Sequence, residues 1–156
     1  MSRQSGFRYS LQPVLLRRQW DLDALKLDMN RVNDALAKLS QERADLQRES
    51  EQVGIAWKNQ STSAVNIVVE RLTTVVYYLE DLTRQIKERN AKIDELNMER
   101  ESLIDRIALA QRSLDAIEQH RDEMNELFMK QLLNKEFKAA DDHWTTLHSR
   151  MEHHDH

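Results

Sequence analysis

The sequence predicts an all-α protein, a long antiparallel two-helix coiled-coil hairpin whose second helix is longer than the first. The 156 residues include two glycines and one proline, too few turn formers for a β-sandwich, a barrel or an alternating strand and helix fold. Charged residues make up 32% of the chain, which favours a narrow apolar seam over one large core. Apolar residues recur with a period of about 3.5 along two stretches, as is typical of coiled coils.

Residues 1–10 are small, polar and basic, and predict a poorly ordered leader before a single hairpin domain over 11–134. The first helix is expected over about 12–54, because Pro13 suits a first helical turn. Its seam follows alternating steps of four and three residues from Leu11 to Trp57. The apolar seam positions are Leu11, Leu15, Leu22, Leu25, Met29, Val32, Leu36, Leu39, Leu46, Val53 and Trp57.

The only turn is expected at about 54–63, where Gly54 precedes a run of small polar residues. The second helix is expected over about 63–134. Its seam runs from Val65 to Phe128 without a change of phase. A turn near 58–59 would place Leu11 opposite Ile107 and leave residues past about 110 overhanging the first helix. Residues 135–156 are interpreted as a loosely helical or disordered tail rich in histidine.

Several classes of function are disfavoured by composition. The chain has no cysteine, and its net charge is −4, which argues against thiolate metal sites, a cysteine nucleophile and general nucleic-acid binding. The tail histidines are spaced by five residues (His143, His148, His153) and do not share one helical face. We therefore expect no enzyme activity, no cofactor and no metal site. No apolar run is long enough for a membrane span, which favours the cytoplasm.

Two surfaces are candidates for binding partners. Arginines occupy seam positions (Arg18, Arg43, Arg89, Arg100, Arg121), either snorkelling to flanking carboxylates or marking an end that meets another protein. After the turn, Val69, Val76, Tyr77 and Tyr78 lie off the seam and widen its apolar face. They are interpreted either as a docking patch or as local packing covered by the turn.

The start of the first helix reads Phe7-x-Tyr9-x-Leu11-x-x-Val14-Leu15-x-x-Arg18, and residues 111–121 form a stretch with Arg112 and Arg121. This pattern resembles the type III protein-export stalk family of flagellar and injectisome proteins (FliJ/YscO-type). The resemblance implies a non-enzymatic central stalk and escort protein, or chaperone. Its end bearing both termini would face the hexameric export ATPase through Phe7, Leu11, Leu15, Arg18, Arg112 and Arg121. Its turn end would contact the export gate through Val69, Val76, Tyr77 and Tyr78.

The resemblance also implies a monomer in the cytoplasm, peripherally associated with the inner-membrane export apparatus. Partners would be the ATPase, the cytoplasmic part of the gate and secretion chaperones, without nucleic acid and without membrane insertion. The alternative is a generic coiled-coil adaptor or tether that associates with itself through the overhanging second helix. The sequence does not separate a flagellar from an injectisome system.

Overall fold

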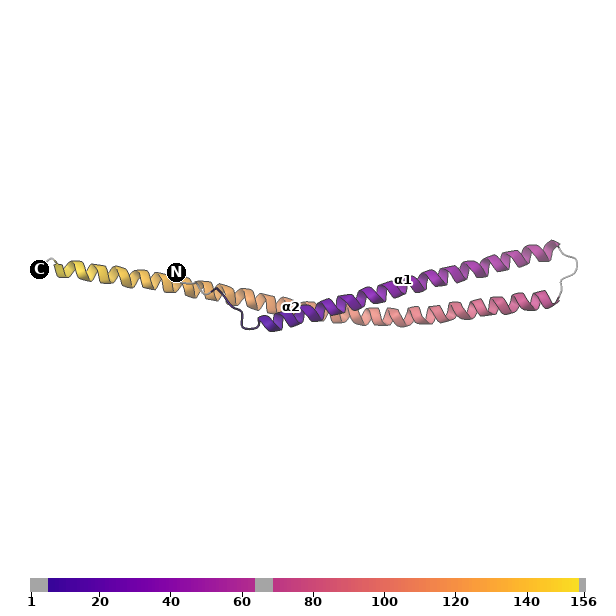
Figure 1. Cartoon of the computed structure of the whole chain (residues 1–156), viewed down its shortest axis with the longest axis horizontal. Helices are drawn as coiled ribbons and strands as arrows, with labels where there is room; N and C mark the ends of the chain where they lie inside the picture. The colour runs from indigo at the N-terminus through magenta and orange to yellow at the C-terminus, as the bar shows by residue number, and fades with distance from the viewer. Residues whose placement is uncertain (1–5, 64–68, 155–156) are drawn as a thin grey trace. The chain divides into compact units, whose positions relative to one another are not determined.

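The predicted fold class is confirmed by a computed structural model that describes residues 6–63 and 69–154, with the backbone alone at 61–63. Helix α1 spans Gln12–Ser63 and helix α2 spans Val69–His154. The two helices pack against one another in opposite directions, and the described residues contain no strand (Figure 1). The second helix is the longer, as the sequence predicts.

The start of α1 follows from its local chemistry. The backbone N–H of Gln12 donates to the carbonyl of Tyr9 over 3.2 Å, and the N–H of Leu15 donates to Leu11 over 2.9 Å. Pro13 stands in the first turn, where its missing N–H would have no helical acceptor. The predicted beginning of the first helix is therefore confirmed.

The predicted turn at 54–63 is wrong, because α1 continues through Gly54 to Ser63. Gly54 has no positive φ, and an added Cβ there would meet open space. A glycine inside a helix costs only about 1 kcal/mol relative to alanine, which a seam of this length readily offsets. The chain passes from α1 to α2 through 64–68, which lie outside the described residues together with the predicted seam positions Val65 and Val68. At its other end, α2 extends past 134 to His154.

The chain divides into two compact units, each containing part of both helices. One, here called the terminal unit, comprises residues 1–22 with 109–156; the other, the middle unit, comprises residues 23–108. The buried core consists of Tyr9, Leu15, Leu22 and Leu114 in the terminal unit and Val32, Leu82, Ile93 and Leu103 in the middle unit. All of these except Tyr9 are predicted seam positions, so the seam is confirmed at these residues, whereas the predicted seam positions Leu11, Leu72 and Met124 are exposed.

The register of the two helices differs from the predicted one. In the middle unit Glu42 lies beside Arg89, whereas a turn at 58–59 would put residue 75 there. In the terminal unit Tyr9 lies beside His120, where the predicted register would put residue 108. The register is displaced because α1 ends at Ser63 rather than near 54. The predicted start of the overhang, near residue 110, is wrong for the same reason.

Candidate partner-binding surfaces

An aromatic cluster joins the leader to α2 in the terminal unit. The Tyr9 side chain is buried, and a hydrogen bond of 2.6 Å joins its hydroxyl to Nδ1 of His120. The rings of Phe7 and Phe128 lie 5.7 Å apart between centroids, tilted by 50°. Aromatic contacts of this geometry stabilise beyond the area that they bury. The leader is thus packed at residues 7 and 9, against the prediction of a poorly ordered segment, while residues 1–5 lie outside the described residues.

The candidate ATPase-facing residues fall into two groups. Leu11, Arg18 and Arg112 are exposed and available to a partner. Leu15, by contrast, is the most buried side chain of the core. It packs within the protein and is not accessible to a partner. Arg121 is half-buried and lies 3.5 Å from Asp122, while Phe7 packs on Phe128. Asp21, four residues after Arg17, lies 3.5 Å from Arg17.

The candidate gate patch belongs to the middle unit. Its four residues, Val69, Val76, Tyr77 and Tyr78, are all exposed. Tyr78 donates a hydrogen bond to the carboxylate of Glu49 on α1. This hydrogen bond raises the pKa of Tyr78 above its ordinary value, since the phenol donates only while it keeps its proton. The described residues therefore leave the patch open to solvent while anchoring one of its tyrosines across the hairpin.

Two seam arginines reach polar partners on the opposite helix. Arg89 Nε donates to Glu42 Oε2 over 3.0 Å, and Arg43 donates to the side-chain oxygen of Asn90 over 3.1 Å. The guanidinium groups are only partly withdrawn from water, as expected when a long stem covers apolar surface. Arg89 thus reaches a carboxylate, as predicted, whereas Arg43 reaches an amide oxygen in place of the predicted carboxylate, and the nearby Asp45 pairs with Arg48.

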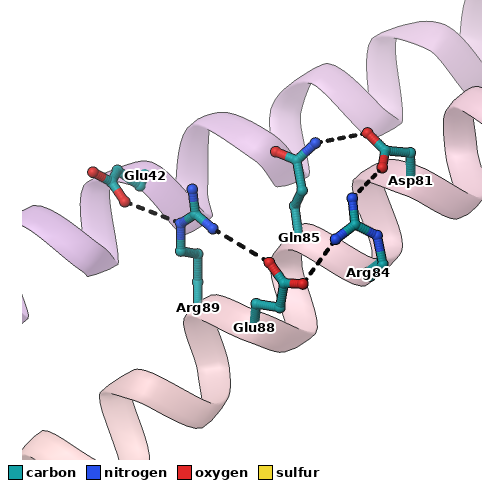
Figure 2. A network of polar contacts seen from close by, with 6 residues as sticks. All are labelled: Glu42, Asp81, Arg84, Gln85, Glu88 and Arg89. Carbon is teal, nitrogen blue, oxygen red and sulfur yellow. Dashed lines mark hydrogen bonds and ion pairs between the residues drawn. The ribbon is translucent and has the colours of Figure 1, made fainter.

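A chain of polar contacts along α2 continues from Arg89 (Figure 2). Glu88 lies 3.9 Å from Arg89 and accepts a hydrogen bond of 2.8 Å from Arg84. Arg84 also donates to Asp81. Hydrogen bonds from Arg84 and then from Gln85 lower the pKa of Asp81, since both stabilise its charged form. These contacts are solvated pairs of the kind that support an exposed helix face.

One further surface was missed in the sequence. Every described residue from 133 to 154 is exposed, yet large apolar side chains recur along this segment in heptad steps. We call this set the C-terminal stripe: Leu133, Phe137, Ala140, Trp144, Leu147 and Met151. The seam that ends at Phe128 would continue to 131, 135 and 138, so the stripe follows a shifted phase. A search for heptads in a new phase would have found it.

Among the residues that the structure describes, no group of three or more histidine or acidic side chains is placed to hold a metal ion. Neither α1 nor α2 offers, over these residues, an apolar stretch sufficient to cross a bilayer. The chain matches no protein-family model, no curated protein and no solved structure.

Proposed function

We propose that this protein is the non-enzymatic central stalk of a type III secretion or flagellar export apparatus. In this role it inserts into and regulates the hexameric export ATPase and links the ATPase to the cytoplasmic part of the export gate. The observation that carries the proposal is that an apolar side chain, Leu11, and two cationic ones, Arg18 and Arg112, are all exposed on the helices of the terminal unit. The resemblance of the leader and first helix to this family points the same way.

The helix pair suits a mechanical link. Two helices that cover one another's seam over many turns bend less readily than a loop or a single helix, because bending would disturb the side-chain packing between them as well as the hydrogen bonds within each helix. The Glu42–Arg89 and Arg43–Asn90 contacts oppose slides of less than one heptad in the middle unit. A force applied by a partner bound to the terminal unit would thus be transmitted along the continuous helix α2.

The cationic surface suits an acidic ring lining. Arg18 and Arg112 are exposed and can form paired hydrogen bonds with carboxylates. Exposed charges also steer the approach of an oppositely charged partner, and this attraction weakens as salt is added. The gate patch differs from the cationic surface in its chemistry. Its valines and tyrosine rings favour an apolar contact, and the tyrosine hydroxyls can add hydrogen bonds at the edge of that contact.

The proposal is tested by measuring ATP hydrolysis by the purified cognate ATPase, with and without this protein, under conditions that allow ring assembly. We expect stimulation, and a concentration for half-maximal effect that rises about fivefold for Arg18→Ala and for Arg112→Ala, as loss of about 1 kcal/mol implies. The matched control is Arg106→Ala, an exposed arginine of the middle unit. Equal hydrolysis with and without the protein would contradict the proposal.

The gate contact is tested separately, by binding to the purified cytoplasmic part of the export gate. Tyr77→Ala and Val76→Ala should weaken this binding and leave ATPase stimulation unchanged. If instead these variants lose stimulation and the arginine variants lose gate binding, the two surfaces serve the opposite partners. A self-associating adaptor or tether is the second candidate function, because the C-terminal stripe is exposed along its whole length.

A further inference from the structure

We infer that the C-terminal stripe is the interface of an antiparallel homodimer, formed between residues 133–151 of two copies of this chain. The inference does not depend on the export role. It departs from the monomer that the family resemblance implies, and it concerns a segment that was in part interpreted from the sequence as a loose tail, 135–156. The structure instead makes this segment part of a continuous helix with all six stripe residues in water.

The stripe fits a second copy of itself layer by layer. Its spacing of four and three residues makes Leu133, Ala140 and Leu147 one set of seam positions and Phe137, Trp144 and Met151 the other. In an antiparallel pair, each residue of one set meets a residue of the other set. Setting Trp144 against Ala140 of the second copy simultaneously brings Phe137 to Leu147 and Leu133 to Met151. All six layers are then apolar, and the largest side chain meets the smallest.

Charge favours the same orientation. Glu136 and Arg150 flank the stripe on one side and would face one another across the dimer, once on each side of its twofold axis. A parallel pair would instead put Glu136 beside Asp141 of the second copy, two like charges, and stack Trp144 on Trp144. On the other side of the stripe the same register places Asp141 beside Asp141 of the second copy, so one like-charge contact stands against two opposite-charge contacts.

The available area sets the expected strength. Phe137 is 66% exposed and Trp144 is 63% exposed, and together with Leu133, Leu147 and Met151 they present on the order of 400 Å² of apolar surface per copy. A dimer would remove about twice this area from water, which is below the roughly 1,200 Å² at which stable specific interfaces begin and in the range of weak, transient ones. Because the segment is already helical, association carries no cost of helix nucleation. We therefore expect a weak dimer that forms at about 10–100 µM and dissociates on dilution.

The first test is sedimentation velocity of the full chain over this concentration range. We expect a rise from 18.5 kDa toward twice that mass. Phe137→Glu and Trp144→Glu should each raise the dissociation constant at least about tenfold. The matched control is Met98→Glu, an exposed methionine on the α2 part of the middle unit, and circular dichroism of each variant checks that helix content is kept. A monomer at every concentration, or a dimer indifferent to both stripe variants, would overturn the inference.

The second test fixes the orientation, and uses the fact that the chain has no cysteine of its own. In the antiparallel dimer, Leu133→Cys and Met151→Cys chains should form a disulfide only when they are mixed, because position 133 meets position 151. Efficient cross-linking of Leu133→Cys with itself would show a parallel dimer and refute the proposal. Glu136→Arg should weaken the dimer roughly tenfold, and combining it with Arg150→Glu should restore it.

Discussion

The sharpest test of the packing in the terminal unit compares two neighbouring leucines of α1. Leu15 is 1% exposed and Leu16 is 40% exposed, so substitution of each by alanine removes the same atoms from opposite environments. Both positions lie in the same turn of the helix, and alanine is a better helix former than leucine. Any difference between the two variants therefore reports the packing of Leu15 against its surroundings and not a change in helix propensity.

The magnitude follows from burial. Truncating a buried leucine to alanine costs about 2–5 kcal/mol, depending on how far the site collapses. A two-helix seam has water close on either side, so we expect the lower part of this range, about 2–3 kcal/mol, for Leu15→Ala. Leu16→Ala should stay within about 0.5–1 kcal/mol, as surface substitutions do. The free energy of unfolding therefore separates the two variants by about 2 kcal/mol.

The assay is urea denaturation followed by circular dichroism at the helix band. With a denaturant slope of about 2 kcal/mol per molar urea, Leu15→Ala should lower the midpoint by about 1 M and Leu16→Ala by less than half of that. Equal midpoints for the two variants would refute the reasoning, since they would mean that residue 15 does not lie in the seam. A lower midpoint for Leu16→Ala than for Leu15→Ala would show that the helix is rotated from its described position.

Two further predictions concern the middle unit. Gly54→Ala should stabilise the protein by about 0.5–1 kcal/mol in the same urea assay, because Gly54 is helical and its Cβ would meet open space; destabilisation would instead place residue 54 in a turn. The raised pKa of Tyr78 means that its hydrogen bond to Glu49 contributes stability that is fully present below the ordinary tyrosine pKa of about 10 and is lost as pH rises through the raised value. The midpoint temperature of thermal unfolding should fall more steeply between pH 8 and 11.5 for the parent chain than for Tyr78→Phe. An equal fall of the midpoint temperature in both proteins would contradict this.

The seam could be predicted because its signal is a sum over many residues. A period near 3.5 maintained over many heptads specifies which face is buried, and Leu22, Val32, Leu82 and Leu103 are buried as that pattern requires. The place of the turn could not be predicted in the same way, because it rests on local propensity. Gly54 and the polar residues after it favour a break by only about 1 kcal/mol each. A helix already held by its seam continues through such residues.

The aromatic anchor of the leader and the C-terminal stripe were missed for different reasons. Tyr9 precedes the helix and belongs to no periodic pattern, so only its contact with His120 reveals that it is buried. The stripe is periodic, but its phase departs from that of the preceding seam. A heptad pattern that is followed in one phase alone therefore ends near Asn134. The candidate partner-binding surfaces share this limit, since the exposure of off-seam residues such as Arg112 or Tyr77 follows from the helix face but the identity of a partner does not.

What holds the two helices in register is the remaining physical question, and the polar pairs are only part of the answer. Sliding the helices by one heptad keeps every seam in phase, and in one direction it would bring Glu49 opposite Arg89 and Asn97 opposite Arg43, so the middle unit would find new partners for both arginines. The same slide would put Leu127 opposite Tyr9 in place of His120 and Lys135 opposite Phe7 in place of Phe128. A buried tyrosine hydroxyl without its partner costs about 1–3 kcal/mol, and the aromatic contact would be lost as well. The aromatic cluster therefore selects among registers that the charged seam residues tolerate, which gives a leader of few residues control over the alignment of two long helices.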